Sequence, residues 1–184
     1  MKISHFFPLV MVLLTALSCH QKTEKMNEET KPVQLIILNP GHFHAALVQK
    51  QMYPEVAPVV HVYGPEGQDM IYYLQKIEQY NKRPEDPTSW ETVVYTGHDY
   101  LERMCAEKNG NVVIIAGNNE KKTSYIHQSL QAGFHVLADK PMAIDVEDFQ
   151  RLEEAFRVAE EKDLLLYDIM TERFEITTIL QKEL

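Results

Sequence analysis

The chain has 184 residues, of which 45% are hydrophobic, and a formal net charge of −9. This length and apolar content suit one domain of ordinary size with a substantial core. The acidic balance argues against nucleic acid as a partner, because phosphate backbones are bound by clustered Lys and Arg.

The N-terminal segment is similar to an export signal. An apolar run over residues 6–17, too short to span a bilayer comfortably, is followed by Ser18 and Cys19. This layout resembles a bacterial lipoprotein signal, in which the Cys is lipidated after cleavage; an ordinary cleaved signal and an uncleaved anchor are the alternatives. We expect a signal peptide over residues 1–18, lipidation of Cys19, and an exported protein that is periplasmic or held at the outer membrane by lipid alone. The polar residues 19–32 are typical of a flexible tether.

From Val33 onward, short apolar runs of the buried-strand kind alternate with stretches of helical spacing. Gly133 stands where a helix end favours glycine, and Asp145 is suited to cap the last helix. In chain order we expect a strand at 34–38, a helix at 42–51, a strand at 59–63, a helix at 69–80, a strand at 91–95, a helix at 99–108, a strand at 112–115, a helix at 121–132, a strand at 135–138, a helix at 145–162 and a strand at 164–167.

Strands that alternate with helices predict parallel pairing, right-handed crossovers and helices on both faces of the sheet. We therefore expect one Rossmann-like, doubly wound α/β domain of about six strands over residues 33–167. Residues 168–184 are typical of the start of another helix, and we interpret them as the beginning of a C-terminal substrate domain that this chain lacks.

The turn after the first strand reads Asn39-Pro40-Gly41-His42-Phe43-His44. A dinucleotide-binding turn has the pattern G-x-G-x-x-G at this place, and only its central glycine, Gly41, is present. That glycine lets the backbone approach a pyrophosphate, and Asn39 tolerates the left-handed conformation that a glycine would supply. The turn opens a helix, whose N-terminus favours an anion. We predict that residues 39–44 bind a cofactor; a plain strand-to-helix turn is the alternative.

His42 and His44 could also be read as a pair of metal ligands. Residues two apart on a helix face different ways, and no Cys, Asp or Glu lies near them in the sequence. We therefore predict no metal site.

Glu66 is the acid nearest the end of the second strand, where a carboxylate is expected to hold the adenosine ribose. No Arg or Lys stands beside it to receive a 2′-phosphate, which favours NAD over NADP. An exposed loop glutamate is the alternative interpretation.

Three motifs carry a family resemblance: Ala116-Gly117-Asn118-Asn119, Ala132-Gly133-Phe134-His135-Val136 and Asp139-Lys140-Pro141. They resemble the Ala-Thr-Pro-Asn, Ala-Gly-x-His-Val and Glu-Lys-Pro motifs of the Gfo/Idh/MocA family, named after glucose–fructose oxidoreductase and inositol dehydrogenase. The resemblance covers roughly residues 33–174. The Pro-Gly-His-Phe-His turn and an Ile-Met-Thr-Glu-Arg segment are similar to a subgroup of exported Bacteroidetes proteins.

The resemblance implies the NAD(P)-binding domain of an oxidoreductase that moves hydride between nicotinamide and a sugar or polyol hydroxyl in the full-length protein. It places Lys140 beside the nicotinamide as the catalytic residue, where an ammonium can hydrogen-bond the hydroxyl and stabilise an alkoxide. A surface lysine is the alternative. The residues implied to line the cofactor are Ala116, Gly117, Asn118, Asn119, Asp139, Lys140 and Pro141; the two asparagines could instead be turn formers.

Two other functions stay open at this point. One is an NAD-dependent glycosidase of the same family, which recycles the cofactor. The other is an inactive fragment or a non-catalytic surface binding module, favoured by the reduced glycine pattern, by the lack of the family's His after the Asn turn, and by the missing second domain. A hydride cannot be moved between two partners if only one is held. A homo-oligomer would form through the missing domain.

Overall fold

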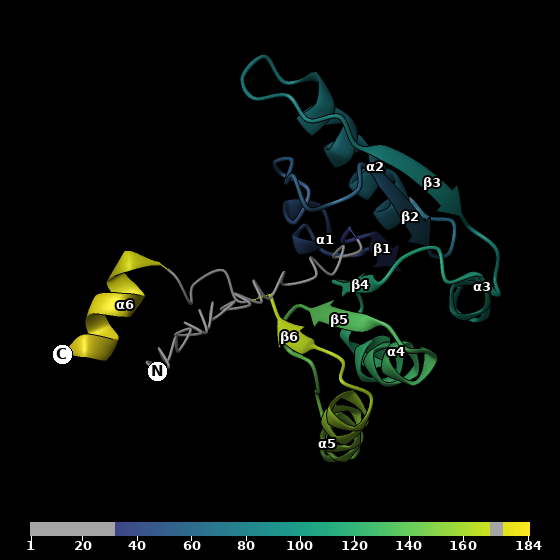
Figure 1. Cartoon of the computed structure of the whole chain (residues 1–184), viewed down its shortest axis with the longest axis vertical. Coiled ribbons are helices and arrows are strands. Elements are labelled where there is room, and N and C mark those ends of the chain that lie inside the picture. The colour runs from purple at the N-terminus through teal and green to yellow at the C-terminus, as the bar shows by residue number, and fades with distance from the viewer. Residues whose placement is uncertain (1–31, 170–174) are drawn as a thin grey trace, which may run out of the picture. The chain divides into compact units, whose positions relative to one another are not determined.

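A computed structural model describes residues 32–169 and 175–184 (Figure 1). The expected signal peptide, Cys19 and the tether up to residue 31 lie outside these residues. Within the described ranges, none of the helices has the length and apolar character needed to cross a membrane.

Strands and helices alternate along the whole described chain. Their bounds are β1 Leu35–Leu38, α1 His44–Leu47, β2 Val59–Tyr63, α2 Gln68–Lys82, β3 Glu91–Tyr95, α3 Tyr100–Glu107, β4 Val112–Ile115, α4 Asn119–Ala132, β5 His135–Ala138, α5 Val146–Glu161, β6 Leu166–Asp168 and α6 Ile176–Glu183. The expected α/β alternation is confirmed, and four of the strands have the predicted bounds.

The six strands form one parallel sheet in the order β3-β2-β1-β4-β5-β6 (Figure 1). After β3 at one edge, the chain returns to the middle of the sheet and places β4 beside β1. This reversal of strand order is the switch point of a doubly wound fold, and ligands bind there, outside the carboxyl ends of the strands. The predicted Rossmann-like fold class is confirmed.

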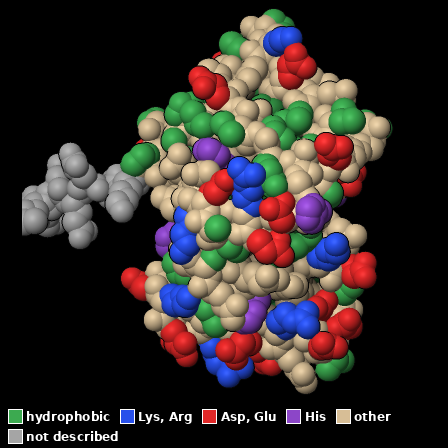
Figure 2. Space-filling model, turned by 90° about the vertical axis from the view of Figure 1, so that its right-hand side faces the viewer, with side chains coloured by type: hydrophobic (Ala, Val, Ile, Leu, Met, Phe, Trp, Pro, Cys, Tyr) green, Lys and Arg blue, Asp and Glu red, His purple; other side chains and the backbone are tan. Residues whose placement is uncertain are grey.

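The central strands β1 and β4 are apolar because both faces of the sheet are covered there. Along β1, Ile36 and Leu38 join a core with α3, α4 and α5, while Leu35 and Ile37 join a second core with α1 and α2. Figure 1 shows these two groups of helices on opposite sides of the sheet. On the face of the molecule in Figure 2, acidic and basic side chains lie interspersed rather than gathered by sign.

The first helix is much shorter than predicted: residues 42–51 were expected, and α1 has four residues. Tertiary contacts end it. The N–H groups of Gln49 and Lys50 bond three residues back, which tightens the last turn. The Gln49 side chain is fully buried and accepts from Tyr73 Oη at 2.5 Å, and its carbonyl accepts from Trp90 Nε1 at 2.7 Å. Helix propensity is a local property of the sequence, so it does not include these contacts with Tyr73 and Trp90.

One other boundary shifts for a local reason. The Leu164 N–H donates to the Ala159 carbonyl at 2.8 Å and closes α5, so the last strand begins at Leu166. Asp145 caps α5 as predicted, with its side chain accepting from Asp148 N at 2.8 Å. The helix expected after residue 168 is present as α6, beginning at Ile176.

Candidate functional site

The turn between β1 and α1 is built around close backbone contact. Asn39 has the positive φ of 46° that the sequence suggested, and its side-chain amide donates to Tyr125 Oη at 3.2 Å. The N–H groups of Gly41 and His42 donate to the Ala116 carbonyl at 3.0 and 3.1 Å. The turn after β1 is therefore held against the end of β4.

Gly41 and Gly117 meet at this contact. A Cβ on Gly41 would lie 3.2 Å from the Gly117 Cα and 3.3 Å from Asp69 Oδ2. A Cβ on Gly117 would overlap the Asn39 carbonyl oxygen. The two glycines thus let the turn after β1 pack closely against the end of β4, at the place where the strand order reverses and where ligands of this fold bind.

A pocket of about 410 Å³ opens at the carboxyl ends of β1, β4 and β5. It contains most of the residues that the sequence proposed, together with one that it did not, Asp69. The lining residues are Gly41, His42, Asp69, Gly117, Asn118, Asn119, Asp139, Lys140 and Pro141. Segments about 75 to 100 residues apart in the chain are therefore brought together, because parallel strands end at one edge.

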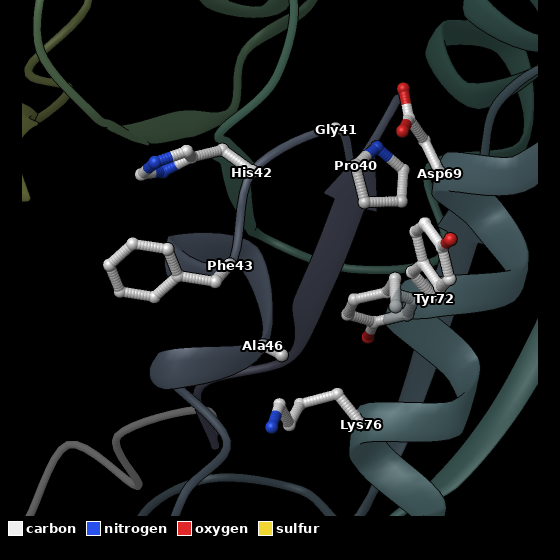
Figure 3. Close-up of a pocket in the computed structure, with 9 residues that line it drawn as sticks. Pro40, Gly41, His42, Phe43, Ala46, Asp69, Tyr72 and Lys76 are labelled. Carbon is white, nitrogen blue, oxygen red and sulfur yellow. The ribbon is translucent and has the colours of Figure 1, made fainter.

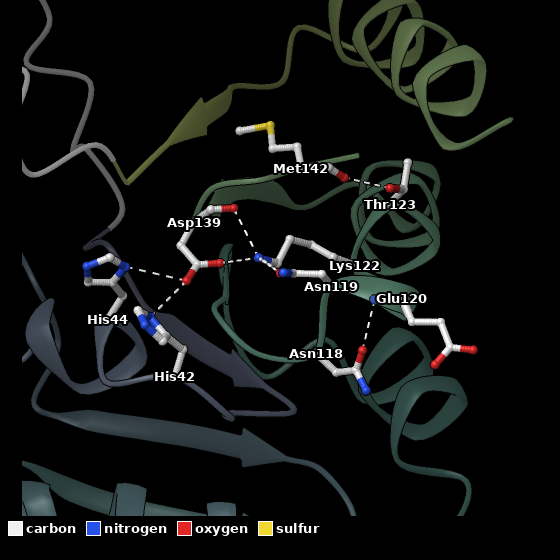
Figure 4. A network of polar contacts seen from close by, with 9 residues as sticks. All are labelled: His42, His44, Asn118, Asn119, Glu120, Lys122, Thr123, Asp139 and Met142. Carbon is white, nitrogen blue, oxygen red and sulfur yellow. Dashed lines mark hydrogen bonds and ion pairs between the residues drawn. The ribbon is translucent and has the colours of Figure 1, made fainter. Parts of the chain in front are cut away.

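Asp139 is the centre of a buried polar network beside this pocket (Figure 4). One carboxylate oxygen, Oδ1, forms an ion pair with Lys122 Nζ of α4, and both side chains are almost fully buried. Lys122 Nζ also donates to Asn119 Oδ1 at 2.7 Å and to the Asp139 carbonyl at 3.2 Å. The pair fixes the Asp139-Lys140 segment against α4 and so sets the position of Lys140. Sequence reasoning missed Lys122, since nothing in its pattern distinguishes it from the neighbouring exposed Lys121.

The other oxygen of Asp139 faces two histidines. His42 Nδ1 lies 3.1 Å and His44 Nδ1 3.4 Å from Asp139 Oδ2, and both rings point toward it in Figure 4. The expectation that these rings diverge is wrong, because His42 precedes the helix that begins at His44. Burial lowers the pKa of His42 below its usual value and neighbouring His44 lowers it further, while Asp139 acts in the opposite direction.

A second hollow, of about 220 Å³, lies between the turn and α2 (Figure 3). Pro40 and Phe43 line it from the turn; Tyr72 and Lys76 line it from α2. A third, of about 180 Å³, is lined by Asn39, Pro40, Glu66 and Asp69 among others. Asp69 lines all three hollows. The sequence offered one signal for Asp69: it is an acidic residue in the first turn of the helix that follows β2.

The predicted site residues therefore divide into groups. Ala116 is buried and contributes its carbonyl to the turn, and His44 is buried behind Asp139. Glu66 stands apart from the main pocket, in the third hollow, where its carboxylate accepts from Thr96 Oγ1 at 3.3 Å. Asn39 lines the third hollow, and the remaining predicted residues line the main pocket or the second hollow.

The three hollows are neighbours around the turn between β1 and α1. They adjoin through shared residues and surround the turn, with the bare backbone of Gly41 and Gly117 between them. Carboxylates at Glu66 and Asp69 are acceptors for ribose hydroxyls, and the main pocket offers amide and ammonium donors. The residues present thus fit a nicotinamide dinucleotide.

Comparison with known proteins agrees with this geometry. A family model described as "Oxidoreductase family, NAD-binding Rossmann fold" matches residues 74–167, just over half of the chain. A putative oxidoreductase from Parabacteroides merdae has a solved structure that is 59% identical, with a TM-score of 0.82 over 84% of this chain and 35% of that one. No curated protein sequence matches the chain.

Two more distant solved structures share the fold. The WlbA dehydrogenase from Bordetella pertussis, in complex with NADH and UDP-GlcNAcA, is 19% identical with a TM-score of 0.62, over 84% of this chain and 39% of that one. Myo-inositol 2-dehydrogenase from Lactobacillus plantarum is 14% identical with a TM-score of 0.60, over 83% and 40%. The chain thus spans well under half the length of these three proteins. It belongs to the Gfo/Idh/MocA family of oxidoreductases, of which it is an NAD(P)-binding Rossmann domain.

Proposed function

We propose that this domain binds NAD across the three hollows, and that the whole protein uses it to exchange a hydride with a hydroxyl of a sugar or polyol. The observation that carries the proposal is the position of Lys140, which is exposed, lines the main pocket, and follows directly on the anchored Asp139. A flexible side chain on a fixed backbone is suited to hold a substrate oxygen.

When bound, NAD supplies the hydride acceptor; the protein's own groups handle the oxygen and its proton. The Lys140 ammonium would hydrogen-bond the substrate oxygen and stabilise the negative charge that develops on it, while the hydroxyl proton would pass to a base of the proposed substrate domain. Asn118 and Asn119 line the same pocket and offer amide groups for orientation. Asp139 and Lys122 act as positioning residues for this segment.

The preference for NAD over NADP rests on the carboxylates. Glu66 and Asp69 would accept hydrogen bonds from ribose hydroxyls and would repel a 2′-phosphate. Lys76 is a cation of this region; it lines the second hollow, which Glu66 does not line. The relative affinities for NADH and NADPH therefore test which hollow receives the adenosine ribose.

The first experiment is calorimetric titration of the 184-residue chain with NADH and, separately, with NADPH. We expect one site for NADH with a Kd below about 1 mM, and binding of NADPH at least about tenfold weaker, equivalent to about 1.4 kcal/mol. Lys140→Met should retain most of the NADH affinity, because Lys140 serves the substrate oxygen. Absence of saturable heat with either cofactor would remove the proposal.

The wider assignments are proposals with their own tests. Sequencing the gene beyond Leu184 shows whether a substrate domain follows. If one does, turnover of sugars and polyols by the longer chain should be abolished by Lys140→Met, and persisting turnover would exclude its catalytic role. Export as a lipoprotein predicts that Cys19 incorporates a labelled fatty acid in cells and that Cys19→Ser prevents this.

A further inference from the structure

His42, His44 and Asp139 each offer a ligand atom, and these atoms all lie within 4.8 Å of one another. We propose that these three side chains bind a divalent transition-metal ion of the Zn²⁺ class, with His42 Nδ1, His44 Nδ1 and Asp139 Oδ2 as ligands. Two imidazoles and one carboxylate are a donor set that such ions favour, whereas Mg²⁺ and Ca²⁺ prefer sets made of oxygen.

Two of the three donor separations are close to those of a coordination shell. Zn²⁺ binds imidazole nitrogen and carboxylate oxygen at about 2.0–2.2 Å, and tetrahedral geometry then separates neighbouring ligand atoms by about 3.3–3.5 Å. The two nitrogen–oxygen separations are 3.1 and 3.4 Å. All three ligand atoms lie within 4.8 Å of one another, so binding one ion requires the side chains to draw closer together.

His44 supplies independent support for a ligand here. Its side chain is 8% exposed, and its Nδ1 is buried without a hydrogen-bond partner in the described part of the chain. Buried polar atoms in native proteins are nearly always satisfied. In Figure 4 the ring is aimed at Asp139, the carboxylate it would share an ion with. A metal ion between the two would satisfy this nitrogen.

The surroundings of Asp139 resemble the outer shell of a metal centre. Its second oxygen is held by the buried Lys122, which fixes the direction of the free one. Lys122 balances the carboxylate charge, and Lys140 is a second cation nearby, so the three ligands and two lysines carry a net positive charge when both histidines are neutral. A net positive charge disfavours Mg²⁺ and Ca²⁺, which bind mainly by electrostatic attraction. Ions of the Zn²⁺ class also form strong bonds to imidazole nitrogen and are favoured here.

Three protein ligands leave one coordination position open. Because His42 and Asp139 also line the main pocket, that position faces the space that contains Lys140. A water molecule or a substrate oxygen would occupy it, as in open zinc sites. The identity of this fourth ligand rests on the proposed function, whereas binding of the ion by the three side chains does not.

The test uses the 184-residue chain freed of metal with a chelator and then dialysed. Titration with Zn²⁺ by calorimetry, and with Co²⁺ by visible absorption, should each show one site, with the intense Co²⁺ bands of a four-coordinate ion. His42→Ala and His44→Ala should each weaken Zn²⁺ binding at least about 100-fold, since loss of mere outer-shell partners costs about 10–100-fold. His98→Ala, at an exposed histidine, is the matched control.

Two results would overturn the inference: no Zn²⁺ binding tighter than about 100 μM, equivalent to about −5.5 kcal/mol, or equal affinity in the control and both site variants. His42 is 41% exposed, so its replacement should leave the fold intact, as circular dichroism can verify. NADH titration of the same samples keeps failure of the metal site distinct from failure of cofactor binding.

Discussion

The buried Lys122–Asp139 pair provides the strongest stability test of the site. Lys122 is fully buried, and Lys122→Met keeps most of the stem volume while removing the ammonium from Asp139. Breaking one partner of a buried ion pair costs about 3–5 kcal/mol, because the other charge stays buried without compensation. For a chain of this size, each kcal/mol lowers Tm by about 2–4 °C. We therefore expect Tm to fall by about 6–20 °C.

Urea unfolding followed through Trp90 measures this effect, since Trp90 is the only tryptophan and is buried. Lys121→Met, at the exposed neighbour on α4, should change the free energy of unfolding by less than about 0.5 kcal/mol. Combining Lys122→Met with Asp139→Asn should recover at least half of the single-variant loss. The reasoning is refuted if Lys122→Met costs less than about 1 kcal/mol, or if the losses of the two single variants simply add.

Further predictions concern the core, alkaline pH and the turn. Tyr73→Phe leaves the buried Gln49 Oε1 without its donor and should cost about 1–3 kcal/mol by urea unfolding; a cost near zero contradicts the assigned hydrogen bond. Burial raises the pKa of Tyr63 to about 12, so the folded state keeps a proton that the unfolded state loses above about pH 10. Stability should fall between pH 10 and 12, and Tyr63→Phe should flatten that slope; an unchanged slope rules the contribution out. Gly117→Ala should weaken NADH binding at least about tenfold by pushing the turn away from β4, while Gln128→Ala, at an exposed residue of α4 that lines none of the three hollows, should not; equal effects would exclude the steric account.

Much of the fold was predictable because its signals are local. The strands at 59–63, 91–95, 112–115 and 135–138 are short runs rich in β-branched and other apolar residues, and their bounds agree with the sequence. The length of α1 was not predictable, because Gln49 ends that helix through contacts with Tyr73 and Trp90, which lie 24 and 41 residues away.

The site was predictable in outline only. Parallel strands place their carboxyl ends together, so Gly41, Gly117 and Lys140 were expected to meet, and they line one pocket. The partners of Asp139 were not predictable, since Lys122 is 17 residues away and His42 nearly 100. A buried lysine and an exposed one look alike in sequence, and only packing separates Lys122 from Lys121.

Binding of NADH to the 184-residue chain is the decisive measurement for the cofactor site, and Gly117, at the contact between the turn and β4, is the residue at which to perturb it. We expect one saturable site in calorimetry, with a Kd below about 1 mM that rises at least about tenfold in Gly117→Ala and stays unchanged in Gln128→Ala, at an exposed residue outside the three hollows. No saturable binding, or binding that Gly117→Ala leaves untouched, would contradict the assignment of this pocket as the cofactor site.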